Sequence, residues 1–269
     1  MLALEIAILS ERGGRPYNED ACGHWHSENE LCCVVADGAG GHGGGGIASR
    51  LVVERLLQAF AARPDTRELA LHRAIRDANR SLIEARVPGT ESENMHSTVV
   101  ALAIDFANHR ARWAHAGDSR LYWFRNDRVL TQTRDHSVVQ ALVDGGLLSP
   151  ERMRSHPSRS ELHSALGIAD DSLQVADSGD ARTVEAGDVF LLCTDGLWEY
   201  VEERRLEDTL RQAASPAAWL AALEGEVAAA TLQKASHDNF SALTVWTAAA
   251  PGADAATEGG ETVWPSKPA

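Results

Sequence analysis

The feature that most constrains the fold is a series of β-type segments between Thr98 and Thr131 that follow one another across short polar breaks. Breaks such as 107–109 and 126–127 leave no room for a crossover helix. Neighbouring strands here are therefore predicted to be antiparallel. Alternating or β-rich segments complete the predicted strands, which lie near residues 3–10, 31–36, 97–106, 110–116, 119–125, 188–194 and 241–247.

Helical periodicity occurs in blocks between groups of strands rather than after every strand. The predicted helices cover 47–62, 66–86, 138–145, 202–213 and 216–230. This grouping favours an α+β fold in layers over a strictly alternating parallel fold.

Residues 1–247 are predicted to form one domain, because no repeat and no linker divides them. The tail, 248–269, is rich in Ala, Gly, Pro, Thr and Glu and is predicted to be disordered, with Trp264 as its one large aromatic residue.

Composition narrows the classes of partner and compartment. The net charge of −14 argues against broad contact with nucleic acid, which needs Lys and Arg to neutralise phosphates. No apolar run approaches the ~20 residues of a membrane span, and Glu5 interrupts the N-terminal apolar segment, which is predicted to be a first strand and no signal peptide. The four cysteines, Cys22, Cys32, Cys33 and Cys193, form no C-x-x-C pair, which favours reduced thiols in a cytoplasmic protein.

Two apolar strands end in the same way, one in Asp37-Gly38 and the other in Asp195-Gly196. A strand holds a terminal carboxylate rigidly, and the glycine lets backbone or an ion come close. A single Asp-Gly after a strand is usually only a turn. Two copies of this pattern in one chain favour a functional site over a simple turn.

Further carboxylates occur at Glu19, Asp20, Asp118 and Asp238. If the strands gather them at one edge, their mutual repulsion requires a cation, and oxygen-only ligands suit Mg²⁺ or Mn²⁺. Two such ions can polarise a water and clamp a phosphoryl group, so the pattern points to metal-assisted phosphoester hydrolysis. No P-loop, G-x-S-x-G elbow or H-E-x-x-H helix offers another chemistry.

Seven motifs occur in the order in which one family carries them. They are Arg15-Pro16-Tyr17-Asn18-Glu19-Asp20, Asp37-Gly38-Ala39-Gly40-Gly41-His42, Ser97-Thr98, Gly117-Asp118-Ser119-Arg120, Asp135-His136-Ser137, Asp195-Gly196-Leu197-Trp198 and Asp238-Asn239-x-Ser241. On these residues the chain resembles the bacterial metal-dependent serine/threonine protein phosphatases of type 2C. The resemblance implies a sandwich of two packed antiparallel sheets flanked by helices on both sides.

The resemblance also implies the roles of the metal ligands. Asp37 would bridge two ions, with the Gly38 carbonyl on one of them, and Asp195 and Asp238 would complete the first ion's ligands. The second ion would be held through water by Glu19 and Asp20.

Three further features follow from the resemblance. Asp118 would hold a third, weaker ion together with Asp195. Arg15 would grip the substrate phosphate, for which a planar guanidinium is well shaped. The segment from Asp135 to about Leu166 would form the family's flap, which lies near the site and influences substrate choice.

The chain departs from the family at Ala39, where animal members carry a histidine proposed as general acid and many bacterial members a methionine. No other residue of the sequence is identified as that acid. His42 matches a histidine of bacterial relatives and is interpreted as a structural hydrogen-bonding residue of the glycine loop.

The leading hypothesis is a monomeric phosphatase of phosphoserine and phosphothreonine in proteins that uses two or three Mn²⁺ or Mg²⁺ ions and opposes a serine/threonine kinase. A metal-activated water would attack phosphorus directly. Two alternatives stay open. One is a pseudophosphatase that binds a kinase or phosphoprotein without turnover, which Ala39 alone supports. The other is a phosphatase of a small phosphorylated metabolite.

Overall fold

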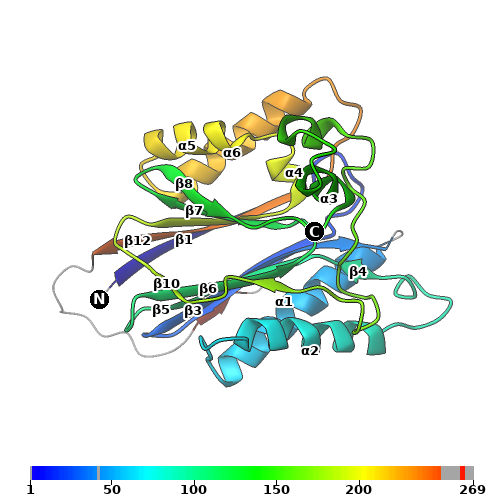
Figure 1. Ribbon diagram of the computed structural model, residues 1–269, viewed down its shortest axis with the longest axis horizontal. Helices are drawn as coiled ribbons and strands as arrows, with labels where there is room; N and C mark the ends of the chain where they lie inside the picture. Colours follow the sequence, from blue (N-terminus) through cyan, green and yellow to red (C-terminus); the bar gives the residue numbers. More distant parts are fainter. Residues whose placement is uncertain (1, 41–42, 250–260, 264–269) are drawn as a thin grey trace.

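The computed structural model describes residues 2–40, 43–249 and 261–263 of the 269-residue chain. Two antiparallel sheets lie face to face, and helices cover the outer face of each (Figure 1). This confirms the α+β class and the sandwich that the family resemblance implies.

The two sheets run antiparallel throughout. The five-stranded sheet has the order β1 (Leu2–Glu11), β12 (Phe240–Ala249), β11 (Val189–Cys193), β7 (Arg120–Arg125) and β8 (Arg128–Gln132). The path through the eight-stranded sheet is β10 (Arg182–Thr183), β6 (Arg110–Ala116), β5 (Val99–Asp105), β3 (Glu30–Ala39), β2 (Asp20–His26) and β13 (Glu261–Val263). Off this path, β4 (His96–Ser97) pairs with β3 and β9 (Ala176–Asp177) with β6.

Strand β3 shows why the sequences of these strands are continuously apolar. Side chains alternate between the two faces of a strand. Leu31, Cys33 and Val35 enter the core between the sheets, whereas Cys32 and Val34 enter the core under the helices. Both faces are buried, so the run has no polar alternation, and a carboxylate at its end is held by a rigid element.

The helices form one layer on each side and a group at one end. Helices α1 (Gly44–Ala62) and α2 (Ala70–Glu84) cover the eight-stranded sheet, and α5 (Glu203–Gln212) and α6 (Pro216–Thr231) cover the five-stranded sheet (Figure 1). At one end lie α3 (Val138–Asp144), α4 (Asp195–Trp198) and the 3₁₀ helix η1 (Pro150–Ser155). In the part of the chain that the structure describes, no helix is long and apolar enough to cross a membrane.

Helix α1 begins three residues before its predicted start at residue 47, inside the glycine run. The glycines permit this because the helix start lies directly against β3. A Cβ on Gly45 would lie 2.5 Å from the carbonyl oxygen of Gly38, and a Cβ on Gly38 would lie 1.9 Å from that of Gly45. These contacts fix the helix start beside the end of β3.

The structure also differs from the sequence prediction at one long strand and at the tail. Strand β2 was not predicted, because its buried residues include Gly23 and His24, which are not typical of a strand core. The tail was expected to be disordered from residue 248, but β12 continues to Ala249 by backbone pairing with Leu2, and Glu261–Val263 pair with β2. The remaining tail, including Trp264, lies outside the described residues.

Candidate metal centre

The predicted carboxylates meet where strands of both sheets end. Asp20 at the start of β2 lies directly opposite Asp37 near the end of β3. Asp195 is the first residue of α4, two residues after the end of β11. Asp118 lies in the turn between β6 and β7, and Asp238 lies two residues before β12. Segments separated by up to 218 residues thus supply one acidic group, as the strand-end argument predicted.

Hydroxyl groups fix the acidic strand ends. Thr98 accepts a hydrogen bond from the backbone N–H of Asp37 at 2.9 Å, and its own N–H donates to the Asp37 carbonyl at 2.8 Å. Thr194 donates to Oδ2 of Asp20 at 2.9 Å and accepts from the N–H of Ser241 at 2.9 Å. These bonds hold the two sheets' strand ends in register around the carboxylates.

Asn239 fastens the loop that carries Arg15 and Glu19. Its side-chain amide donates to the carbonyls of Arg12 at 2.7 Å and Tyr17 at 2.9 Å, and its oxygen accepts from the N–H of Glu19 at 2.8 Å. Asn239 is buried and follows Asp238 directly. No role was predicted for Asn239 from the sequence, although its position next to an acidic residue before a strand was an available signal.

The pKa values of the buried aspartates are raised, as expected for acids whose charges are not balanced by nearby cations. Burial raises the pKa of Asp20 to about 8, and Asp195 and Asp238 add to that rise. Burial raises the pKa of Asp195 to about 7. The pKa values of Asp37 and Asp118 also rise well above the usual range, first through burial and then through neighbouring aspartates, Asp195 among them in both cases. These four aspartates can be ionised together only beside added positive charge.

The donor set fits a hard divalent cation. Three buried carboxylate oxygens, Oε1 of Glu19, Oδ1 of Asp20 and Oδ1 of Asp195, have no hydrogen-bond partner among the described residues. Buried polar oxygens ordinarily have partners, and oxygen donors suit Mg²⁺ or Mn²⁺. Within residues 2–40, 43–249 and 261–263, no three acidic, imidazole or thiol groups are already arranged around a single point as ligands. The structure therefore brings the predicted ligands together without showing the coordination that the resemblance implies.

Arg15 lies beside this group and is open to solvent. Its Nη2 donates to Oδ2 of Asp238 at 2.7 Å, and the two side chains are 53% and 45% exposed. A guanidinium has five N–H donors, so this pair leaves several for a ligand.

The end of β3 continues past Asp37 into Gly38 and Ala39, which pair with Ser97 and His96 of β4. Ala39 is exposed and presents no group that could transfer a proton. The proposed role of the Gly38 carbonyl stays a prediction. His42 lies outside the described residues.

The flap segment carries a polar group for which the sequence predicted no role. Ser137 caps α3 by accepting from the N–H of Gln140. Asp135, two residues earlier, forms a buried ion pair with Arg120. Its partner lies 15 residues away along the chain, and no local pattern indicates that pairing.

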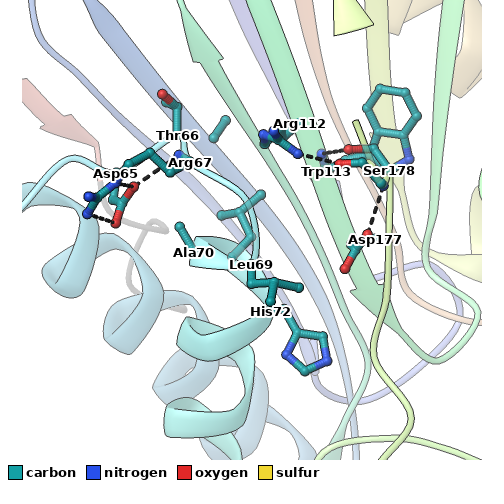
Figure 2. Close-up of a pocket in the computed structure, with 13 residues that line it drawn as sticks. Asp65, Thr66, Arg67, Leu69, Ala70, His72, Arg112, Trp113, Asp177 and Ser178 are labelled. Atoms are coloured by element: carbon teal, nitrogen blue, oxygen red, sulfur yellow. Dashed lines mark hydrogen bonds and ion pairs between the residues drawn. The ribbon is translucent and has the colours of Figure 1, made fainter. Parts of the chain in front are cut away.

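A small hollow in the structure lies away from the carboxylates. Figure 2 shows it beside the first turn of α2, where Asp65 pairs with Arg67, with Asp177 and Ser178 on the other side. It encloses about 10 Å³, roughly the room of one water molecule, and no predicted site residue lines it. It is therefore not a candidate active site.

Comparison with known proteins agrees with this geometry. The family model described as protein phosphatase 2C matches residues 11–235. The serine/threonine protein phosphatase PstP of Mycobacterium tuberculosis is 34% identical over 212 residues, which are 78% of this chain and 39% of PstP. The chain thus spans about two fifths of that relative. The serine/threonine phosphatase stp of Listeria welshimeri is 32% identical over 77% of this chain and 83% of its own length.

A solved structure is similar over nearly the whole domain. The catalytic domain of PstP in complex with two manganese ions superposes with a TM-score of 0.76 at 30% identity, covering 93% of this chain and all of that one. With the motifs in order, the strand-end carboxylates gathered and the family model matched over most of the chain, this protein belongs to the protein phosphatase 2C family of serine/threonine phosphatases.

Proposed function

We propose that this chain hydrolyses phosphoserine and phosphothreonine in proteins and so reverses a serine/threonine kinase. The observation that carries the proposal is the group of five aspartates from separate strand ends, with unpartnered buried oxygens, beside the exposed Arg15. The fold requires no such group for its stability, because packed like charges destabilise it.

The proposed cofactors are two Mn²⁺ or Mg²⁺ ions, with a third, weaker ion between Asp118 and Asp195. The manganese ions of the PstP complex support this choice. When bound, such ions polarise a water and the phosphoryl group for direct attack at phosphorus. Asp37 would hold both ions and the Gly38 carbonyl one of them, Asp195 and Asp238 would complete the first ion's ligands, and Glu19 and Asp20 would hold the second through water.

The chain's own residues then position the substrate. The solvent-facing guanidinium of Arg15 would bind two phosphate oxygens at once, with Asp238 orienting it from the side. Asn239 holds the backbone on both sides of Arg15, so the guanidinium is presented from a fixed loop. Ala39 supplies no acid, so the leaving oxygen would take its proton from water in the open site.

The proposal includes a compartment and an assembly state. All four cysteines are buried and unpaired, which suits a reducing cytoplasm. The domain is proposed to act as a monomer on phosphorylated proteins.

The test is phosphate release from a phosphothreonine peptide with Mn²⁺. Asp37→Asn and Asp238→Asn each replace a charged oxygen by an amide, and we expect the rate to fall at least ~100-fold, the scale on which ligand and supporting residues affect metal sites. Asp127→Asn is the matched control, because Asp127 is exposed and has a positive φ that Asn adopts equally well.

The outcomes separate the alternatives. Unchanged rates in Asp37→Asn and Asp238→Asn contradict the proposed site. Tight Mn²⁺ uptake without hydrolysis of any phosphorylated peptide indicates a binding module, and a larger kcat/KM on a phosphorylated metabolite than on peptides indicates a metabolite phosphatase.

A further inference from the structure

A buried cation links the flap to the carboxylate group. The guanidinium of Arg120, at the start of β7, donates from Nε and Nη2 to both oxygens of Asp135, at 2.9 and 2.8 Å. The two side chains are only 3% and 2% exposed. Asp135 begins the flap, and Arg120 follows Asp118 by two residues. A buried pair of this kind costs desolvation and is strong only with full bidentate geometry, as here.

Trp198 lies against this pair and contacts both acidic loops. The guanidinium carbon of Arg120 is 3.6 Å from the centroid of the Trp198 ring. The indole Nε1–H donates to the backbone carbonyl of Asp118 at 2.9 Å. Trp198 is also the last residue of α4, a helix of four residues that begins with Asp195. One fully buried side chain thus ties the loop of Asp118 to the helix of Asp195.

The backbone of the loop that carries Asp118 requires such a restraint. Gly117 has a φ of +102°, and a Cβ there would lie 2.7 Å from the side chain of Thr98. The chain turns sharply here between β6 and β7. The hydrogen bond from Trp198 therefore restrains the backbone that carries the Asp118 carboxylate.

The flap also reaches Trp198 through Arg154 of η1. The Nε of Arg154 donates to the Trp198 carbonyl at 2.9 Å, and its Nη2 donates to Oε1 of Glu203 at 2.9 Å. The same oxygen of Glu203 accepts from the hydroxyl of Tyr122 at 3.2 Å, and that hydroxyl accepts from Arg120 at 3.0 Å. Docking of η1 and the placement of Trp198 therefore share one hydrogen-bonded network.

We propose that Trp198 is a positioning residue of the metal centre, which holds Asp118 opposite Asp195, and that Arg154 couples the flap to the same tryptophan. The inference rests on the proposed function in that it takes these two carboxylates as ligands of a divalent ion. It assigns to the flap a second task beside substrate choice, which is to stabilise the weakest ion site.

The experiment is calorimetric titration of the full chain with Mn²⁺, with the Mn²⁺ concentration for half-maximal phosphate release as a second readout. Trp198→Phe keeps an aromatic ring under Arg120 and removes the N–H donor together with part of the indole ring. Trp219→Phe is the matched control, because Trp219 is also fully buried and its Nε1–H donates to Thr209 at 3.0 Å, in the core beside α5 and α6. For the flap, Arg154→Met is compared with Arg152→Met, an exposed arginine of the same 3₁₀ helix.

We expect Trp198→Phe to weaken the weakest Mn²⁺-binding step by ~10- to 100-fold, the usual cost of losing a residue that orients a ligand. The Mn²⁺ concentration for half-maximal activity should rise with it, while kcat at saturating Mn²⁺ changes much less. Arg154→Met should shift the same step in the same direction by a smaller factor and should speed hydrogen exchange in residues 151–155. The two control variants should bind Mn²⁺ as the parent does.

Each other outcome overturns the inference. A Trp198→Phe variant that binds Mn²⁺ like the parent, or that differs from it no more than Trp219→Phe does, shows that Trp198 is only part of the core. If Trp198→Phe does not fold, an unchanged titration of Arg154→Met against Arg152→Met overturns the inference in its place. A parent chain that takes up no Mn²⁺ contradicts the proposed function itself, and that result differs from a parent that binds Mn²⁺ while the variants are unaffected.

Discussion

Two arginine–aspartate pairs near the group of acidic residues have the same chemistry and opposite surroundings. Arg15 and Asp238 meet at 2.7 Å with about half of each side chain exposed. Arg120 and Asp135 meet at 2.8 Å with almost no exposure. An exposed pair is solvated and screened and adds little to stability, whereas a buried pair cannot lose one partner without leaving a desolvated charge. The exposed pair can therefore act on a ligand, and the buried pair holds the flap.

Removing one partner of the buried pair should have the largest effect on stability. Arg120→Met leaves Asp135 as an unpaired charge in the core, and we expect a loss of about 3–5 kcal/mol of unfolding free energy. Urea denaturation with chelator present measures it. Arg128→Met is the control, since Arg128 also pairs with a carboxylate, that of Glu207, but is itself exposed.

The double variant Arg120→Met/Asp135→Leu sharpens the same comparison. Because both charges are replaced by apolar groups, it should recover most of the lost stability. If Arg120→Met alone is as stable as the parent, the pair does not hold the flap.

The pH dependence of stability should reveal the flap's contact with the sandwich. His136 is buried, and its Nδ1 accepts from the N–H of Gly117 at 3.3 Å. Burial, then the charges of His115 and His163, lower the pKa of His136 to about 4. The unfolded chain binds this proton more tightly, with a pKa near 6.5. The stability from neutral His136 is therefore present above about pH 6.5 and is lost as the pH falls towards 4.

At pH 5 this loss amounts to roughly 2 kcal/mol relative to pH 7.5. His136→Asn keeps an acceptor for Gly117 and removes the titration, so its unfolding free energy should fall less between these pH values. The measurement is the difference between parent and variant, because the clustered aspartates titrate in both. Parallel pH profiles for the two proteins would contradict the assignment.

The sequence was sufficient to predict a site residue where that residue lies at or just after the end of an apolar strand. Asp37 lies near the end of β3 and Asp195 lies two residues after β11, and the face-to-face packing of the two sheets brings those ends together. It was not sufficient for Arg120, because the partner Asp135 is brought close only when the flap docks. Strand β2 was missed for a related reason, since the core accepts Gly23 and His24 there through contacts that no local pattern records. Local rigidity can be predicted from sequence, and contacts across the flap cannot.

The smallest expected effect on stability belongs to the exposed pair. A double-mutant cycle of Arg15→Ala and Asp238→Ala, measured by denaturation in the presence of chelator, should give a coupling energy below about 1 kcal/mol. The same Arg15→Ala change should raise KM for a phosphothreonine peptide by ~10-fold or more, since it removes a charge-assisted contact to phosphate. Arg12→Ala, an exposed neighbour on the same loop, should change neither quantity. A coupling energy as large as that of the buried pair would show that Arg15 stabilises the loop rather than the substrate, because a solvated guanidinium free to bind phosphate cannot also contribute several kcal/mol to folding.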